Sequence, residues 1–254
     1  MTSGSTGESV LEQRLASLAD RYTLRPELVA KLRVFLDLLV DDPLAPTAIR
    51  DPLAAIDQHL ADSLVALELQ RVREARTALD LGSGAGVPGI PLAVARPDTT
   101  WVLLESAGRK CAFLARAASA CGLANVEVAH ARAESFSEGR GQHDLVTARA
   151  VAKLAVTAEY AAPLLRVGGV LVAWGGRRSE ADEATAAQAG GELGLEGPDA
   201  HRVEPFPDAE HRHLYVMSKV METPSRFPRR PGAALKRPLG SSRRAPNPSD
   251  RAQR

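Results

Sequence analysis

The feature that most constrains this chain is a glycine-rich turn between an apolar run and a helix, LDLGSGAGVPGIP at residues 79–91. Residues 77–81 read as a buried strand, and Pro88 suits the first turn of a helix, where no backbone N–H is needed. Glycines at every second position let the backbone turn sharply and approach a ligand closely. The first N–H groups of the helix lack partners and point at that ligand. The turn therefore predicts a nucleotide-like cofactor at the end of a strand.

Two classes of cofactor fit this turn. The GxGxxG at residues 84–89 satisfies the dinucleotide fingerprint, with Glu105 about 20 residues on as the acid that binds a ribose. The stretch 80–86 also reads as acid-x-Gly-x-Gly-x-Gly, a loop typical of S-adenosylmethionine-dependent methyltransferases. Asp80 can meet the amino group of that cofactor through the loop or a water, whereas it would repel a pyrophosphate. A plain glycine-rich turn is the third interpretation, and we favour S-adenosylmethionine.

Strand and helix patterns alternate after the turn. The predicted strands are 77–81, 100–105, 126–130, 143–147 and 169–174, and the predicted helices are 88–95, 108–121, 153–165 and 179–193. Near-continuous apolar strands alternating with helices indicate a parallel sheet covered on both faces. Residues 201–206 and 211–220 then read as a closing antiparallel pair with a turn at 207–210. We therefore predict an α/β fold, a Rossmann-like class I methyltransferase with a seven-stranded, mostly parallel sheet and helices on both faces. A second nucleotide-binding half, which a dehydrogenase usually needs, has no room in the chain.

Helical patterns precede the turn and a basic segment ends the chain. Leucines recur at helical spacing over residues 10–19 and 28–39, and 52–71 reads as a third helix. None of these helices is long enough to bury its apolar stripe alone. We predict an N-terminal helical cap over 1–72 that packs on a cofactor-binding domain over 73–222. A basic tail rich in Pro and Arg follows over 223–254, and we expect disorder beyond about Leu239.

Charge and composition indicate the kind of partner. The net charge is +1, but residues 221–254 carry nine Lys or Arg against two acids, a net of +7, which leaves about −6 for the rest. A basic tail can meet a polyanion, although a solvated, disordered end is the alternative for the last dozen residues. The two cysteines predict no metal site and no disulfide scaffold, and Cys111 reads as a buried thiol. No apolar run approaches the roughly 18–20 residues that span a membrane, and the first nine residues lack the features of a signal peptide. We expect a cytoplasmic protein, and a monomer because nothing demands an oligomer.

Candidate site residues stand at predicted strand ends, where doubly wound sheets bind ligands. Glu105 ends an apolar run and can accept hydrogen bonds from both ribose hydroxyls; its alternative role is a cap charge for the helix that starts near residue 108. Glu134 follows the third strand and either flanks an adenine or is an exposed loop acid. Arg149 follows the fourth strand and either faces the substrate or is an ordinary surface arginine.

The order and spacing of several motifs resemble the RsmG (GidB) family of ribosomal RNA methyltransferases. The resemblance covers about residues 47–239 and rests on the glycine turn, HLADSL at 59–64, ESAGRKCAFL at 105–114, RAE at 132–134, TARAVAK at 147–153 and TPSRFPRRPG at 223–232. It implies transfer of a methyl group to guanine N7 in the 530 loop of 16S ribosomal RNA, either naked or in the small ribosomal subunit. In the family, cofactor contacts fall on positions matching Gly82, Val87, Ala133, Glu134 and Arg149. To these we add Asp80, Gly84 and Gly86 of the glycine loop and Glu105 at the end of the second predicted strand.

The implied reaction requires little acid–base catalysis by the protein. Guanine N7 has an in-plane lone pair and no proton to lose, so the expected work is alignment and exclusion of water. Arg149 is the candidate catalytic residue, holding the cofactor carboxylate or an RNA phosphate. The fifth strand ends in Trp174-Gly175-Gly176 where the family has Leu-Lys-Gly, and Arg177 or Arg178 could replace the missing lysine. The candidate RNA-binding residues of the tail are Arg226, Arg229, Arg230, Lys236 and Arg237. A methyltransferase of another substrate class and a non-catalytic ribosome assembly factor stay open as alternatives.

Overall fold

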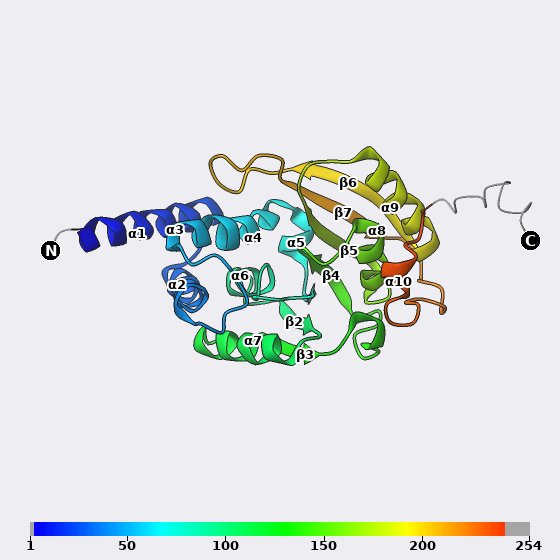
Figure 1. The fold of residues 1–254 in the computed structure, drawn as a ribbon, viewed down its shortest axis with the longest axis horizontal. Helices are drawn as coiled ribbons and strands as arrows, with labels where there is room; N and C mark the ends of the chain where they lie inside the picture. Colours follow the sequence, from blue (N-terminus) through cyan, green and yellow to red (C-terminus); the bar gives the residue numbers. More distant parts are fainter. Residues whose placement is uncertain (1–2, 242–254) are drawn as a thin grey trace, which may run out of the picture.

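The structure, a computed structural model, describes residues 3–241 and centres on a seven-stranded sheet in the order β3-β2-β1-β4-β5-β7-β6 (Figure 1). Strands β1 to β5 pair in parallel, and β7 runs antiparallel between β5 and β6. The predicted mostly parallel sheet with a closing antiparallel pair is therefore confirmed. The strands are β1 Thr77–Leu81, β2 Thr100–Glu105, β3 Val126–His130, β4 His143–Ala148, β5 Leu165–Gly175, β6 Leu195–Arg202 and β7 His213–Lys219.

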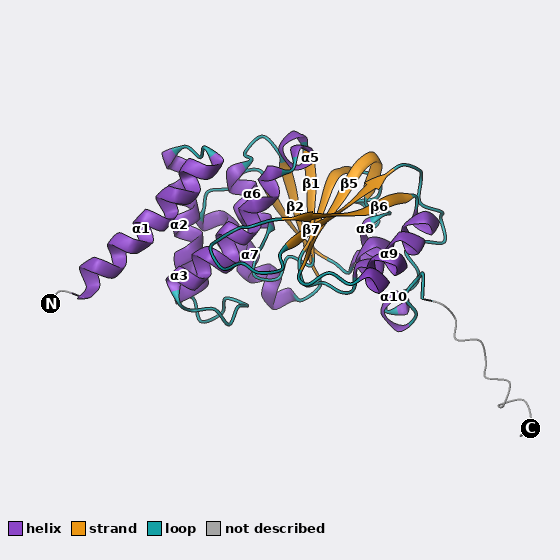
Figure 2. Ribbon diagram, turned by 90° about the horizontal axis from the view of Figure 1, so that it is seen from above, coloured by secondary structure: helices purple, strands orange, loops and turns teal. Residues whose placement is uncertain are grey.

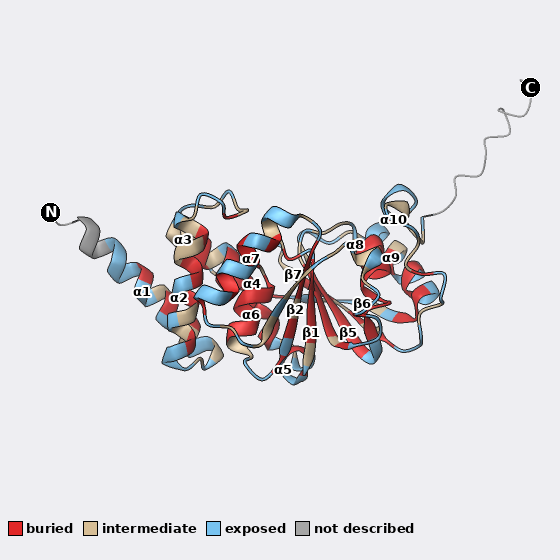
Figure 3. Ribbon diagram, turned by 90° about the horizontal axis from the view of Figure 1, so that it is seen from below, coloured by how far each residue is buried: buried red, intermediate tan, exposed pale blue. Residues whose placement is uncertain are grey.

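Helices cover both faces of the sheet, as Figure 2 shows from above. One face packs on α6 and α7, with the N-terminal helices beyond them, and the other on α8 and α9. Successive residues of β1 point to opposite faces, so Ala78 joins the first core and Leu79 the second. Both are fully buried, which explains the near-continuous apolar run of the central strands, and Figure 3 shows the centre of the sheet as buried. The edge strands β3 and β6 are mostly half-buried or exposed. The covering helices are α6 Gly89–Ala95, α7 Gly108–Ala120, α8 Leu154–Ala161 and α9 Glu180–Leu193.

The N-terminal segment forms two long helices followed by a run of short ones. The long helices, α1 (Ser3–Tyr22) and α2 (Pro26–Asp41), follow the predicted periodicity. The single helix predicted over 52–71 is wrong. The chain there passes through α3 Pro52–Ala55, the π-helical turn η1 Ile56–Ala61, α4 Asp62–Leu64, the 3₁₀ turn η2 Val65–Glu68 and α5 Gln70–Glu74. Residues 59–67 are all buried, so their apolar positions form no single stripe that could reveal the breaks.

The N-terminal helices share one hydrophobic core with the sheet. Helix α2 contacts α6 and α7, and α4 contacts α6. The cluster that contains Phe35 and Leu36 of α2 continues without a break to Leu103 and Leu145 of the sheet. The helical cap therefore covers the α6 and α7 layer and has no separate core, while its boundary at residue 72 stays a prediction.

The antiparallel pair lies elsewhere than predicted. Gly194 ends α9 in the left-handed region, with φ of 78°, and β6 begins at the next residue instead of at 201. Residues 203–212 then lead to β7, in place of a turn at 207–210. The pairing register shifts between Glu196 and Asp199, around Gly197-Pro198, and this irregularity hides the strand from an alternation pattern.

The described part of the tail packs against the α8 and α9 side of the sheet. Phe227 and Ala234 are buried there, and the short helix α10 (Ala233–Lys236) lies beside α8 (Figure 1). The disorder predicted beyond Leu239 concerns a stretch that lies, from residue 242 on, outside the described residues.

Candidate active site

The glycine turn adopts a conformation that requires its glycines. Gly82, Gly84 and Gly86 all have positive φ, of 68°, 57° and 86°. A Cβ atom at Gly86 would lie 2.6 Å from the Cδ1 atom of Ile90 in α6. The N–H group of Gly82 donates to the carbonyl of Leu104 at 2.8 Å, which ties the turn to the end of β2. The turn thus sits at the carboxyl end of the sheet, where the sequence predicts a cofactor.

Asp80 lies beneath this turn and is 1% exposed. One carboxylate oxygen accepts a hydrogen bond from the Thr147 hydroxyl of β4 at 2.8 Å, and the other accepts from the N–H group of Gly89 at 3.3 Å. A Cβ atom at Gly89 would lie 2.8 Å from that second oxygen, so glycine is needed there. Burial raises the pKa of Asp80 to about 6. Asp80 therefore fastens the turn and the start of α6 to the sheet, and its link to a cofactor amino group through the loop or a water stays a prediction.

Glu105 ends β2 beside the turn. Its Oε2 atom accepts from the N–H group of Gly84 at 3.1 Å, and Lys110 Nζ lies 4.0 Å away. Its Oε1 atom accepts from the N–H groups of Ser106 and Ala107 at 2.7 and 2.8 Å. Ala107 is the residue that precedes α7, so the carboxylate caps this helix and meets the glycine turn at once. Its role toward a ribose stays a prediction.

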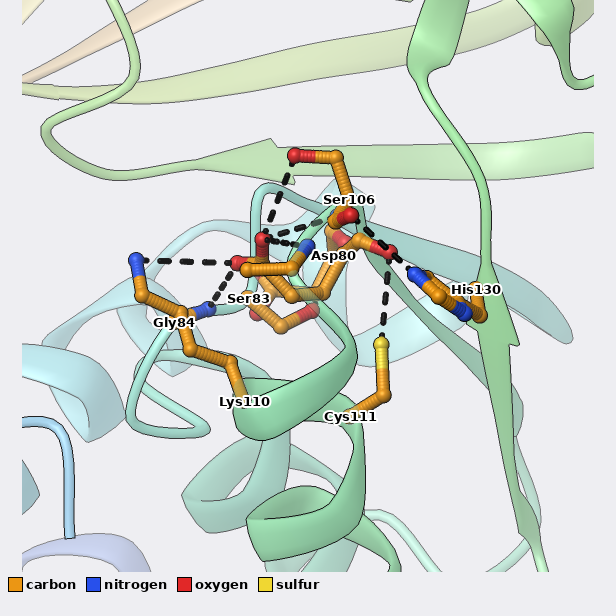
Figure 4. Close-up of polar contacts among 9 residues, drawn as sticks. Asp80, Ser83, Gly84, Ser106, Lys110, Cys111 and His130 are labelled. Carbon is orange, nitrogen blue, oxygen red and sulfur yellow. Dashed lines mark hydrogen bonds and ion pairs between the residues drawn. The ribbon is translucent and has the colours of Figure 1, made fainter. Parts of the chain in front are cut away.

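Two side chains near Glu105 complete this end of the site. The Cys111 thiol lies 3.4 Å from the Glu105 carbonyl oxygen, and burial raises its pKa. Cys111 and Cys121 are both buried and free, as expected for Cys111. His130, at the end of β3, hydrogen bonds to the Ser106 carbonyl at 3.1 Å (Figure 4). These contacts hold the ends of β2 and β3 together.

Glu134 lies on the 3₁₀ turn η3 (Ala133–Ser135) that follows β3. Its Oε1 atom accepts a hydrogen bond from the N–H group of Gly232 in the tail at 3.0 Å. The carboxylate is thus the point where the tail reaches the carboxyl end of the sheet. Neither of the two interpretations made from sequence, an adenine neighbour or an exposed loop acid, includes this contact.

Arg149 follows β4 and turns toward the N-terminal cap. Its Nη1 atom donates to Asp62 Oδ2 and to the Gln58 carbonyl, both at 2.8 Å, and the side chain is only 16% exposed. The next residue, Ala150, has φ of 56°, a left-handed conformation that residues other than glycine rarely adopt. Arg149 is therefore tied to Asp62 through Nη1 and is not an ordinary surface arginine, and its role of holding a cofactor carboxylate or an RNA phosphate stays a prediction.

His59 and Thr47 extend this cluster, and the sequence analysis assigned neither of them a role. Arg149 Nη2 lies 3.4 Å from His59 Nδ1, and His59 Nε2 lies 2.9 Å from the Thr47 hydroxyl. Burial, with the Arg149 charge second, lowers the pKa of His59 to about 4, so the imidazole is neutral at pH 7. The signal in the sequence was a His and an Asp inside an otherwise apolar run at 59–67.

A cavity of about 390 Å³ opens beside this cluster, at the ends of β4 and β5. The Trp174 indole donates to the backbone carbonyl of Asp62 at 2.6 Å and lines the cavity. Arg212, from the segment before β7, also lines it. The full lining is Ile49, Gln58, His59, Asp62, Arg149, Ala150, Trp174, Gly175, Gly176 and Arg212.

Gly175 explains the missing lysine of β5. A Cβ atom at this position would lie 2.3 Å from Cε2 of Tyr215, so the tyrosine ring fills the space of any side chain. The Tyr215 hydroxyl donates to Glu183 at 3.0 Å. Arg178 donates to the same carboxylate through Nε at 2.8 Å and Nη2 at 2.6 Å, and this pairing engages one of the two arginines suggested as a replacement.

The tail cations divide into one half-buried arginine, Arg229, and several exposed ones. Arg229 donates to Glu159 through Nε at 2.8 Å and Nη2 at 2.5 Å, and the Glu159 side chain is 1% exposed. The prediction that Arg229 contacts RNA is therefore corrected, because its guanidinium neutralises a buried carboxylate. Arg226 stacks over Phe227 and lies 3.7 Å from Glu192. The exposed cations of α10 and its flanks are Arg230, Lys236 and Arg237.

Two features are absent from the described residues 3–241, a membrane-spanning helix and a metal-binding cluster. No helix there is long and apolar enough to cross a membrane. No group of three or more His, Cys, Asp or Glu side chains in this part of the chain is arranged to hold a metal ion.

Comparison with known proteins gives consistent matches. A family model described as GidB, rRNA small subunit methyltransferase G, matches residues 31–196. Proteins named ribosomal RNA small subunit methyltransferase G are similar: that of Chloroflexus aggregans is 42% identical over 83% of this chain and 90% of its own, and that of Moorella thermoacetica is 36% identical over 85% and 92%.

Solved structures agree in fold. An S-adenosylmethionine-dependent methyltransferase from Aquifex aeolicus has a TM-score of 0.53 at 12% identity, over 73% of this chain and 97% of its own. An S-adenosylmethionine-dependent O-methyltransferase from Thermotoga maritima has a TM-score of 0.53 at 16% identity, over 75% and 72%. At these identities the likeness concerns the fold alone.

Proposed function

Because the chain belongs to the GidB family of rRNA small subunit methyltransferases, we propose that it transfers a methyl group from S-adenosylmethionine to guanine N7 of 16S ribosomal RNA. The family match over residues 31–196 carries this proposal, since it spans the glycine turn, the Arg149 cluster and the sheet between them. The methylated base lies in the 530 loop, as the family resemblance implies. The protein works as a monomer in the cytoplasm.

The ends of β1, β2 and β3 supply a site that fits the cofactor. Gly82 and Gly84 keep the turn open through positive φ, and the Glu105 carboxylate beside them offers oxygen acceptors for ribose hydroxyls. The cofactor contacts we propose are Gly82, Gly84, Gly86, Val87, Glu105, Ala133 and Glu134. Asp80 supports them from beneath through Gly89. When bound, S-adenosylmethionine supplies an activated methyl group on a sulfonium.

The protein's own contribution is alignment. Guanine N7 carries a lone pair and no proton, so no side chain has to act as a general base. Strands β4 and β5, on the other side of β1 from β2, bring Arg149 and Trp174 to the cavity at their carboxyl ends. Arg149 holds the Asp62 carboxylate at the wall of this cavity, which makes it a positioning residue in the proposed reaction. The role that we propose for this cavity is to hold the base for transfer of the methyl group.

Binding of RNA rests on exposed cations. Arg230, Lys236 and Arg237 lie on one short stretch of the tail, and lysine and arginine side chains meet phosphates without reading sequence. Such contacts make the affinity dependent on salt.

The decisive experiment is mass spectrometry of small-subunit RNA from cells with and without the gene. We expect one 7-methylguanosine to disappear on deletion and to return with the wild-type gene. The purified protein with labelled S-adenosylmethionine is then offered naked 16S RNA, assembled small subunits and free guanosine. Methylation of a metabolite or protein but not of RNA would favour another substrate class. Cofactor binding without transfer to any RNA would favour an assembly factor.

A further inference from the structure

The wall of the cavity beside Arg149 contains a carboxylate oxygen and a guanidinium nitrogen that make no hydrogen bond. Among the described residues, Asp62 Oδ1 and Arg212 Nε are buried atoms of this kind. They form an ion pair with each other at 3.6 Å, which is too long for a hydrogen bond. Both residues line the cavity, and the side chain of Asp62 is 8% exposed whereas that of Arg212 is 40% exposed. Buried polar atoms are nearly always paired in proteins, so this pair of atoms calls for a ligand.

The Asp62 carboxylate is held firmly in place. Its other oxygen, Oδ2, accepts from Arg149 Nη1 at 2.8 Å, and its backbone carbonyl accepts from the Trp174 indole at 2.6 Å. Arg149 is in turn fixed by the Gln58 carbonyl. The free oxygen therefore cannot turn toward another partner without breaking these bonds. A group held this way is preorganised for a ligand.

We propose that Asp62 and Arg212 read the acceptor base as guanine, Asp62 Oδ1 accepting the N1–H of the base and Arg212 Nε donating to its O6. Guanine presents this donor and acceptor side by side, whereas adenine presents an acceptor at N1 and a donor at its 6-amino group. Adenine would therefore place an acceptor opposite Asp62 Oδ1 and a donor opposite Arg212 Nε. Trp174 lines the same cavity and offers an aromatic surface for stacking. This inference rests on the proposed function and adds the residues that select the base.

The same contact assists the reaction. When the N7 lone pair forms its bond to the methyl carbon, the carbon–sulfur bond breaks and its electron pair stays on sulfur. The positive charge passes from the sulfonium to the purine, and no proton moves. The N1–H group becomes a stronger donor as this charge develops, so its hydrogen bond to the Asp62 carboxylate strengthens in the transition state. Asp62 thus contributes to kcat as well as to selection.

The test compares base analogues in wild-type and variant enzymes. Reconstituted small subunits carry guanine, inosine or 2-aminopurine at the position that the wild type methylates. Inosine keeps N1–H and O6, whereas 2-aminopurine has neither. We expect the wild type to use inosine within about tenfold of guanine and 2-aminopurine about 100-fold less well or worse. In Asp62→Asn the guanine rate falls about 30-fold or more, and the ratio of guanine to 2-aminopurine rates falls at least about tenfold, because an amide can donate to a bare N1.

Comparing ratios between enzymes cancels the intrinsic reactivity of each base and any general loss of folded protein. Asp57→Asn is the matched control, since Asp57 lies in the same segment but pairs with Arg14, away from the cavity. Calorimetric binding of S-adenosylmethionine should be unchanged in both variants. Unchanged base discrimination in Asp62→Asn would overturn the inference, and Asp62 would then serve only to hold Arg149. If the wild type itself methylates no small-subunit RNA, the proposed function fails instead.

Discussion

The ion pair between Arg229 and Glu159 allows a sharp test of how the tail is anchored. Removing the guanidinium with Arg229→Met leaves the Glu159 carboxylate, 1% exposed, with only the backbone N–H group of residue 229 at 3.2 Å. Breaking a buried pair from one side typically costs about 3–5 kcal/mol, because the remaining charge is buried without compensation. Arg230→Met is the matched control, since Arg230 is the exposed neighbour in the chain and should lose less than about 0.5 kcal/mol.

Urea unfolding followed by circular dichroism at pH 7 measures the loss of stability in each variant. Replacing both partners, Arg229→Met with Glu159→Leu, should return stability to within a few kcal/mol of wild type, because no charge is left buried. A loss at pH 7 no larger than that of Arg230→Met would refute the reasoning. It would mean that Glu159 is solvated in solution and that Arg229 is free to contact RNA after all.

Three further outcomes follow from the site and the tail. Burial lifts the folded pKa of Asp80 to about 6, so the stabilising contribution of this carboxyl group is present at pH 4 and lost above pH 6. In urea titrations the stability of Asp80→Asn should therefore match that of wild type near pH 4 and exceed it by about 2–3 kcal/mol at pH 8. An equal pH dependence of the two proteins would contradict this. Replacing Lys236 and Arg237 by serine should weaken RNA binding at every sequence and lower the salt slope by about 1–2 in filter-binding titrations, whereas an unchanged slope would remove the tail from the interface. Gly175→Lys should unfold at a lower temperature because its Cβ meets the Tyr215 ring; calorimetry should find it rescued by Tyr215→Gly, and tolerance without that second change would disprove the clash.

The sequence predicted the sheet well because its signal is local. Strands β1, β2 and β4 are mostly runs of buried residues, and the turn between β1 and α6 shows its glycines directly. The proposed cofactor half of the site is built from those strand ends, so a sequence pattern could identify Glu105 and the glycines. The resemblance to a known family then supplied the substrate, which the glycine turn alone does not identify.

The polar pairs could not be predicted from the sequence because they join distant segments. Arg149 meets Asp62 across 87 residues, and Arg229 meets Glu159 across 70. A charged residue in a basic tail and one in a buried pair look the same in a sequence, which is why Arg229 was expected to contact RNA. The π-helical turn at Ile56–Ala61 could likewise not be predicted, because residues 59–67 are all buried and leave no single apolar stripe.

In the site that we propose, cofactor binding and base selection are separable. The proposed cofactor side comes from consecutive strand ends, β1 to β3, whereas the proposed acceptor side gathers Asp62 from the helical cap, Arg149 from β4 and Arg212 from the approach to β7. The link between the two sides is β4, where Thr147 bonds to Asp80 beneath the glycine turn and Arg149, two residues on, holds Asp62. A helical cap that shares its core with α6 and α7 can therefore shape the base pocket while the glycine turn stays fixed to the sheet. This explains why the cap has no separate core: it places a carboxylate opposite the end of β4, and only continuous packing keeps that carboxylate within reach of Arg149.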